Sequence, residues 1–267
     1  NLSDITLRAI AVLRTANVIA CEDTRVTGKL KSEFGLTAQL IPYHEHNADR
    51  ATPALIERLN SGETVALVSD AGTPLVSDPG YRLVNAALNS DIKVIPVPGA
   101  SAPLAALSVS GLPTDRFMFE GFLPNKSAAR RKALEQAATV QATLVFFESA
   151  KRLAKSLADM ADLLGNRDAV IAREITKRFE EMTRGSLGSL AAQFETAPAP
   201  KGEVTIVVGP PGETAAPSEV EIDGLLQEAL IRLSVKDAAS AVASSTGLPR
   251  RPLYQRALQL QSEDGVG

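Results

Sequence analysis

Apolar positions along the chain change repeatedly between helical and strand spacing. From Ile5 to Ala16 they recur every three or four residues, which predicts a helix, and the apolar run Val18–Cys21 that follows indicates a strand. The same succession repeats as far as residue 110. The further elements expected here are helices ending near 35 and over 52–60, 81–88 and 101–110, and strands over 40–41, 65–68 and 93–97. This alternation predicts a mostly parallel sheet covered by helices.

The segment Gly111–Pro113 interrupts the pattern and marks the first expected domain boundary. Beyond it helices and strands alternate again, so we expect a second α/β domain. Its expected elements are strands over 116–120, 143–147, 169–172 and 203–208, an additional strand over 179–183, and helices over 126–138, 150–164 and 186–194.

The last part of the chain has a different character. Residues Gly209 to Ser218 are rich in Pro, Gly, Ala and Glu, a composition typical of a flexible linker. Three short helical patterns follow over 219–233, 235–244 and 250–260, which resembles a small helix-turn-helix unit. The expected organisation is therefore an N-terminal α/β domain over 1–112, a C-terminal α/β domain over 113–209, a linker over 210–218 and a helical tail over 219–262.

Length and composition limit the class of protein. The 267 residues suffice for two medium domains and a tail, and no run of eighteen apolar residues predicts a membrane span. The single cysteine, Cys21, excludes an internal disulfide framework and a four-cysteine zinc site. The first residues also lack the charged and apolar regions of a secretory signal. We therefore expect a cytoplasmic protein.

The net charge of −3 argues against a general nucleic-acid binder, but basic residues are clustered locally. Between Leu230 and Leu260 five basic residues stand against one acidic residue. A second cluster falls within seven residues and consists of Lys126, Arg130, Arg131 and Lys132. Such clusters bind phosphates or form a solvated helix face, and the sequence leaves both interpretations open.

The segment Ser69–Gly80 carries the strongest functional signal. It follows the expected strand Val65–Val68 directly and reads SDAGTPLVSDPG. Its glycines can adopt backbone angles that other residues avoid, and its prolines fix their own φ. Asp70 and Asp78 supply carboxylates. We expect a loop that builds a small-molecule pocket. The alternative is an ordinary strand-to-helix connection in which Asp78 caps the next helix.

Two other segments are expected at the same edge of the sheet. Glu22–Arg25 directly follows a strand, and open α/β sheets bind ligands at the carboxyl ends of their strands. Pro96–Ala102 precedes a helix, and its small residues allow a ligand to approach the first N–H groups of that helix. A tight turn capped by Ser101 is the alternative for this second segment.

Missing motifs narrow the chemistry. The sequence contains neither a P-loop nor a dinucleotide-binding fingerprint, which argues against a kinase or a nicotinamide enzyme. The only histidines, His44 and His46, would face the same side of an extended segment. No third ligand stands at a characteristic spacing, so we expect no metal. Loop hydrogen bonding or substrate contact is the expected role of the two histidines.

Several short motifs occur as a set over nearly the whole chain. They are Asp4-Ile5-Thr6 with Arg8-Ala9, Cys21–Arg25, His44–Asn47, Ser69–Gly80, Pro98-Gly99, Gly111–Pro113, Glu120–Pro124 and Ala172–Glu174. In this combination the chain resembles the ribosomal small-subunit ribose methyltransferase I branch of the tetrapyrrole methylase superfamily. The tetrapyrrole enzymes usually carry Gly-Asp-Pro where this chain has Ser69–Gly72, and that difference favours the RNA branch.

The resemblance implies two α/β domains that hold S-adenosylmethionine between them, in a homodimer. It also implies 2′-O-methylation of a cytidine ribose in the decoding region of small-subunit ribosomal RNA. The residues implied to lie at the cofactor are Asp70, Ala71, Gly72, Thr73, Pro98, Gly99, Ser101, Ala102, Glu148 and Ile175. The family usually opens with a strand and Pro-Ile-Gly-Asn-Leu, of which only Asn1-Leu2 stands here, so weak cofactor binding is expected.

A ribose hydroxyl is a weak acid, so a positioned group must accept its proton. We expect Glu22 or Asp23 in this role, with His44 and Glu174 as further candidates and an Asp23–Arg25 salt bridge as the alternative. The residues expected to contact RNA are Arg25, Lys126, Arg130, Arg131 and Lys132. Because only 4% of residues are aromatic, a broad base-stacking platform is not expected, and phosphate contacts should dominate.

Two other functions are compatible with the sequence. The same scaffold methylates tetrapyrroles or other small molecules, although the basic clusters weigh against such a substrate. A non-catalytic RNA-binding factor for ribosome assembly is the second alternative, and the intact loops around Asp70 and Ser101 weigh against it.

Overall fold

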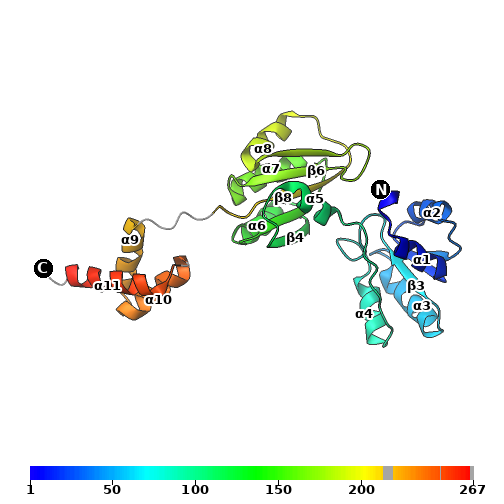
Figure 1. Cartoon of the computed structure of the whole chain (residues 1–267), viewed down its shortest axis with the longest axis horizontal. Helices are drawn as coiled ribbons and strands as arrows, with labels where there is room; N and C mark the ends of the chain where they lie inside the picture. Colours follow the sequence, from blue (N-terminus) through cyan, green and yellow to red (C-terminus); the bar gives the residue numbers. More distant parts are fainter. Residues whose placement is uncertain (213–218, 247, 265–267) are drawn as a thin grey trace. The chain divides into compact units, whose positions relative to one another are not determined.

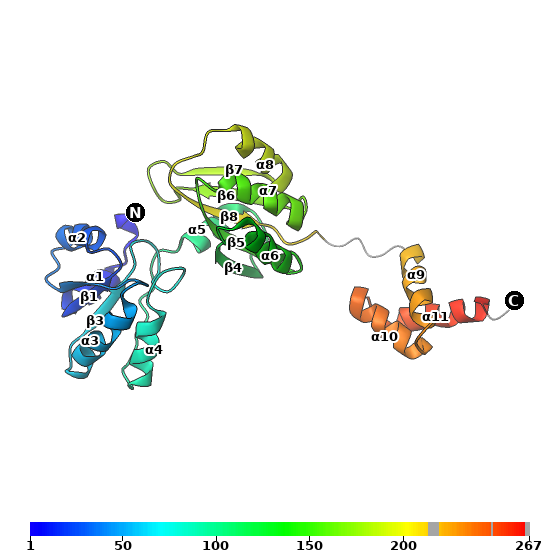
Figure 2. The ribbon, with the colours of Figure 1, turned by 180° about the vertical axis from the view of Figure 1, so that it is seen from behind.

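The computed structural model describes residues 1–212, 219–246 and 248–264, and the chain divides into two units, residues 1–210 and 211–267. The first unit contains two β-sheets with their helices, and the second is helical (Figures 1 and 2). The expected linker over 210–218 falls mostly on residues 213–218, which lie outside the described part of the chain.

Three parallel strands form the first sheet in the order β2-β1-β3, as the alternating pattern predicts. They are β1 (Val18–Cys21), β2 (Gln39–Pro42) and β3 (Val65–Val68). The accompanying helices are α1 (Leu7–Thr15), α2 (Thr24–Glu33), α3 (Ala48–Asn60) and α4 (Tyr81–Asn89), after a short 3-10 turn at Leu2–Asp4.

Strand β1 is buried on both faces. Val18 belongs to one apolar cluster with Leu55 of α3, whereas Ile19 belongs to another with Leu13 of α1. Because neighbouring residues of a strand point to opposite faces, this strand reads as a continuous apolar run. The central position of β1 explains why the sequence pattern locates it so clearly.

The strand expected over 93–97 does not form, and this prediction is wrong. Val94 and Ile95 are 41% and 61% exposed, and no described strand pairs with the segment. The Pro96 carbonyl instead accepts a bond of 3.0 Å from the Arg8 side chain. An apolar run becomes a strand only where a neighbouring strand supplies hydrogen-bonding partners.

The second sheet has five strands in the order β4-β5-β8-β6-β7. Only β4 and β5 pair in parallel, and the other pairs are antiparallel. The strands are β4 (Phe117–Phe122), β5 (Thr143–Ser149), β6 (Asp168–Arg173), β7 (Glu181–Ser186) and β8 (Glu203–Val208). The additional strand expected over 179–183 is present as β7, shifted toward the C-terminus.

Helices cover both faces of this second sheet. Three of them enclose the larger core around Leu144, Phe146 and Ile206. These helices are α6 (Ser127–Ala138), α7 (Leu153–Leu164) and α8 (Leu187–Thr196). On the other face, α5 (Ala102–Ser110) packs Ala106 and Leu107 against Val145. Helix α5 therefore belongs with the second sheet, although it precedes the break at Gly111.

The second unit contains three described helices with an apolar core of their own. They are α9 (Glu219–Leu230), α10 (Val235–Thr246) and α11 (Arg250–Asp264). Leu226, Val242 and Leu253 meet in that core. The predicted helical tail is thus confirmed. Among the described helices, none has the length and apolar character required to cross a bilayer.

Candidate functional site

The loop Ser69–Gly80 has an unusual backbone. Gly72 and Gly80 adopt positive φ angles of 74° and 142°, and the non-glycine residues Leu75 and Ser77 do so at 72° and 64°. Side chains at such angles are strained and persist where the surroundings fix them, as at ligand sites. Helix α4 is capped by Gly80 without a side-chain bond. The alternative in which Asp78 caps that helix is therefore wrong.

The two loops expected to hold the cofactor lie side by side. The Thr73 hydroxyl donates to the Ala100 carbonyl at 3.1 Å, and a Cβ at Gly72 would lie 3.9 Å from the same oxygen. Ser101 begins α5 but makes no capping bond with its side chain, so the capped-turn alternative is wrong as well. The uncapped helix start and the glycine-lined backbone fit a small polar ligand.

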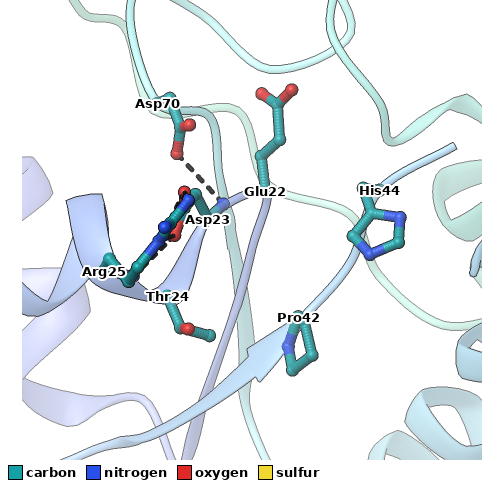
Figure 3. Close-up of a pocket in the computed structure, with 7 residues that line it drawn as sticks. All are labelled: Glu22, Asp23, Thr24, Arg25, Pro42, His44 and Asp70. Atoms are coloured by element: carbon teal, nitrogen blue, oxygen red, sulfur yellow. Dashed lines mark hydrogen bonds and ion pairs between the residues drawn. The ribbon is translucent and has the colours of Figure 1, made fainter.

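The end of β1 meets the same loop in an open pocket of about 430 Å³ (Figure 3). The pocket is lined by Glu22, Asp23, Thr24, Arg25, Pro42, His44 and Asp70. The backbone N–H of Asp23 donates to an Asp70 carboxylate oxygen at 3.1 Å, which ties the strand end to the loop. The loop Ser69–Gly80 thus contacts both of the other segments in which the sequence predicts chemistry.

The two candidate proton acceptors differ in their surroundings. Asp23 caps α2, accepts a 2.8 Å bond from the Arg25 N–H and pairs with the Arg25 guanidinium at 2.6 Å. These bonds lower the pKa of Asp23 to about 2. Burial and the nearby charge of Asp70 instead raise the pKa of Glu22. Glu22 is therefore the more basic of the two carboxylates, whereas Asp23 caps the start of α2.

Asp78 is one of the two carboxylates that the sequence predicts for the pocket-forming loop. Burial, and after it the charge of Glu22, raise the pKa of Asp78 to about 6. Its carboxyl also shares a hydrogen bond with Ser69. The sequence places Asp78 in the same loop as Asp70, but no local signal indicates that Glu22 lies close enough to affect its protonation.

His44 lies across the pocket from Glu22 (Figure 3). Its backbone N–H donates to the Asn47 side chain at 2.9 Å, whereas its ring Nδ1 is buried without a hydrogen-bond partner. His46 lies 6.1 Å from it, centroid to centroid. The described residues contain no group of three His, Cys, Asp or Glu side chains with the arrangement of a metal site.

Glu174 is engaged at the end of β6. Its carboxylate accepts bonds of 2.9 Å from both the Glu203 N–H and the Lys177 ammonium. These bonds lower the pKa of Glu174, which makes it a weak proton acceptor. The neighbouring Ile175 packs against the apolar cluster that contains Ala106 and Leu107 of α5. Ser101 directly precedes this helix.

Comparison with known proteins agrees with this fold. Residues 1–191 match the model of the family described as tetrapyrrole (corrin/porphyrin) methylases. The chain belongs to the tetrapyrrole methylase family. Residues 216–261 of this methylase also match the RsmI C-terminal HTH domain, so the C-terminal unit has a family of its own.

Full-length relatives of the methylase carry one name. A protein of Mesorhizobium japonicum is 51% identical over 100% of this chain and 91% of its own length. A protein of Escherichia coli O157:H7 is 43% identical over 98% of this chain and 92% of its own. Both are named ribosomal RNA small subunit methyltransferase I.

Solved structures share the fold at low identity. The methyltransferase CobJ is 23% identical, with a TM-score of 0.59 over 80% of this chain and 90% of its own. A diphthine synthase is 17% identical, with a TM-score of 0.61 over 78% of this chain and 86% of its own. The expected α/β methylase fold is thereby confirmed.

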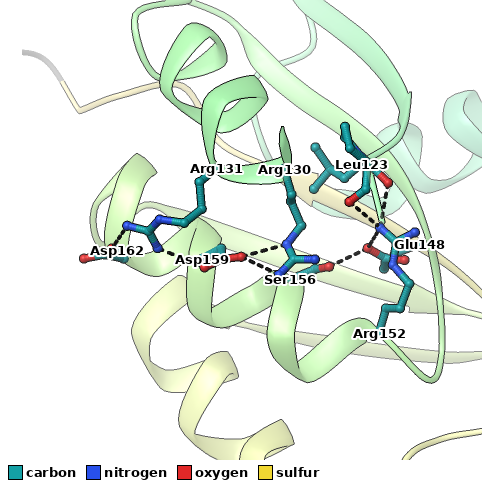
Figure 4. A network of polar contacts seen from close by, with 9 residues as sticks. Leu123, Arg130, Arg131, Glu148, Arg152, Ser156, Asp159 and Asp162 are labelled. Carbon is teal, nitrogen blue, oxygen red and sulfur yellow. Dashed lines mark hydrogen bonds and ion pairs between the residues drawn. The ribbon is translucent and has the colours of Figure 1, made fainter. Parts of the chain in front are cut away.

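The Glu148 side chain of the methylase is fully engaged in hydrogen bonds within the second sheet and its helices (Figure 4). Its side chain has no exposed surface, and its carboxylate accepts bonds from the Ser149 N–H, the Arg152 guanidinium and the Ser156 hydroxyl. The carboxylate therefore has a structural role within this part of the fold, and a cofactor contact through the rest of Glu148 stays a prediction.

The four cations clustered at the start of α6 do not form one surface, and the prediction fails at Arg130. Its side chain is only 7% exposed and pairs with Asp159 of α7 at 2.6 Å. Arg131 pairs with Asp159 and Asp162 of the same helix. Only Lys126 and Lys132 are exposed without an ion pair to any described residue. Arg25 is exposed too, but it is paired with Asp23.

Proposed function

We propose that this methylase transfers a methyl group from S-adenosylmethionine to the 2′-oxygen of a cytidine ribose in the decoding region of small-subunit ribosomal RNA. The relatives named ribosomal RNA small subunit methyltransferase I support the substrate class, since they align along nearly the whole chain. The observation that carries the chemistry is Glu22, a proton acceptor of raised pKa in the pocket beside Asp70. We further propose that the protein acts in the cytoplasm as a homodimer.

The two adjoining loops are the proposed cofactor site. When bound, S-adenosylmethionine supplies a methyl group that its sulfonium has already activated. The residues proposed to hold it are Asp70, Ala71, Gly72, Thr73, Pro98, Gly99, Ser101, Ala102 and Ile175. The hydrogen bond between Thr73 and Ala100 supports this assignment, because it fixes the spacing of the two loops.

Glu22 is the proposed acceptor of the ribose proton. A general base works best when its pKa is close to the operating pH, and burial beside Asp70 moves Glu22 in that direction. The Asp78 carboxyl in the same loop as Asp70 also binds a proton more readily than an ordinary aspartate, because burial raises its pKa to about 6. Asp23 remains ionised, keeps the start of α2 in place and orients Arg25.

The test compares Glu22→Gln with the matched variant Asp23→Asn. Small ribosomal subunits, naked ribosomal RNA and a porphyrinogen are supplied with labelled S-adenosylmethionine. Loss of a positioned base should lower kcat on the subunits by roughly 10²–10⁴-fold in the Glu22 variant, with cofactor binding unchanged. Asn caps helices well, so the Asp23 variant should retain most of its kcat.

Each outcome of this test has a definite meaning. Resistance of the neighbouring linkage to alkali identifies the ribose oxygen, because a methylated 2′-hydroxyl cannot attack the phosphate. Label in the porphyrinogen alone would replace the proposal by small-molecule methylation, and no label in any substrate would favour a non-catalytic RNA-binding factor. Full activity of the Glu22 variant would remove Glu22 from the mechanism.

A further inference from the structure

Phe122 is an exposed aromatic side chain at the carboxyl end of β4. It is 57% exposed, although its ring contacts Phe147 at a centroid distance of 5.3 Å. Phe147 contacts Phe119 edge-on at 5.1 Å. The three rings therefore form a short row in which Phe119 and Phe147 are half-buried and Phe122 is exposed.

This row lies on the face of the sheet that α5 covers. Val145 packs against α5, and Phe147 points to the same face because side chains alternate along β5. Phe119 packs against the same apolar cluster. Since α5 begins directly after Ser101, the rings share a face with one of the two proposed cofactor loops.

The backbone beside Phe122 touches the other cofactor loop. Gly121 has a φ of 65° at an irregularity of β4, and a Cβ added there would lie 2.9 Å from the Ser77 hydroxyl. Ser77 belongs to the loop Ser69–Gly80, and Asp70 of that loop lines the pocket together with Glu22. The residue next to Phe122 therefore lies against the loop that also borders the proposed proton acceptor.

The residues that follow Phe122 are held from the other side by Arg152 (Figure 4). Its guanidinium donates to the Leu123 carbonyl at 2.6 Å, to the Pro124 carbonyl at 3.4 Å and to the Asn125 side chain. Buried Glu148 pairs with the same guanidinium at 3.1 Å. The exposed ring thus extends from a backbone fixed on both sides, which is how preorganised binding groups are built.

We propose that Phe122 is the surface on which the base of the target nucleotide stacks. The inference rests on the proposed RNA substrate. A nucleotide whose ribose enters an active site leaves its stacked neighbours, and an aromatic side chain replaces the lost stacking. One ring suffices for one base, so the low aromatic content of the chain does not oppose this role.

The experiment compares Phe122→Leu with Phe122→Tyr, with Phe117→Leu as the matched control. Phe117 lies at the start of the same strand and is 43% exposed. Loss of the ring should raise KM for small ribosomal subunits about ten-fold, and Tyr should retain the wild-type value because it still stacks. Cofactor affinity and Tm should be unchanged in all three variants, and Phe117→Leu should methylate normally.

The outcomes separate this inference from the proposed function. If the wild-type protein does not methylate ribosomal RNA, the proposed function fails. If it does and Phe122→Leu keeps a normal KM, the stacking role is overturned. A change of oligomeric mass in Phe122→Leu would equally overturn it, because the ring would then be a contact between copies of the chain.

Discussion

At the scale of single residues, two neighbouring acids have opposite roles. Asp23 and Glu22 are equivalent in the sequence, yet hydrogen bonds to Arg25 lower the pKa of Asp23 to about 2, whereas burial raises that of Glu22. One acid therefore stabilises a helix, and the other is the proton acceptor that we propose. The difference arises from the orientation of each side chain relative to α2 and Asp70.

The raised pKa of Asp78 leads to a pH-dependent prediction. Because it rises from 3.8 to about 6, the native state holds this proton more tightly, so stability falls as the pH increases between these values. Asp78→Asn removes that loss and should raise the free energy of unfolding by roughly 1 kcal/mol at pH 7.5, a figure discounted for partial exposure. The gain should disappear near pH 4.

Urea unfolding at pH 4 and pH 7.5 measures this effect. An equal gain at both pH values would contradict the assignment, because a general improvement in packing would not depend on protonation. The wild-type protein measured alongside serves as the control for the pH dependence of the other groups.

At the scale of elements, the pairing of α6 with α7 decides which cations face the solvent. Arg130 points to α7 and forms a buried ion pair, whereas Lys132, two residues later, is exposed. Residues two apart on a helix lie on different faces. The phosphate-binding surface expected from the sequence is therefore smaller than its four cations suggest.

Two variants of α6 separate stability from RNA contact. Arg130→Met leaves Asp159 with Arg131 alone and should lower the free energy of unfolding by about 2–3 kcal/mol, without changing the salt dependence of RNA binding. Lys132→Met should leave stability within about 0.5 kcal/mol and reduce the salt dependence. Urea titrations and RNA affinities at several salt concentrations measure both. A lower salt dependence in the Arg130 variant would contradict its burial.

At the scale of the whole molecule, residues 211–267 form a unit with their own apolar core. So small a core supplies little stability of its own. Leu253→Ala should therefore unfold this unit alone, since deleting a buried leucine side chain costs about 2–5 kcal/mol. Calorimetry should show the main transition unchanged and the helical unit lost.

Leu157→Ala is the matched control for this prediction. Leu157 is fully buried in the core of the first unit, so its loss should lower the main transition instead. If Leu253→Ala lowered the main transition as well, the two units would unfold cooperatively, contrary to the division of the chain.

The sequence by itself determined most of the elements and the segments in which chemistry is expected. Strand β1 is an unbroken apolar run because helices cover both its faces, and the pattern over 65–68 predicts β3 residue for residue. The loop Ser69–Gly80 was identified by glycines that its backbone requires, most clearly Gly80, where a Cβ would lie 2.6 Å from the Leu67 side chain. Such signals are local, so they can be read along the chain.

Only the tertiary structure decided which of these signals became contacts. The apolar segment 93–97 is not a strand because no described strand pairs with it, and Glu148 is a structural carboxylate because Arg152 and Ser156 enclose it. Likewise, the pKa of Glu22 is raised by burial and by the charge of Asp70, which is distant in the sequence. Pairing, burial and charge proximity depend on residues far apart in the chain, whereas hydrophobic period and turn chemistry depend on adjacent ones.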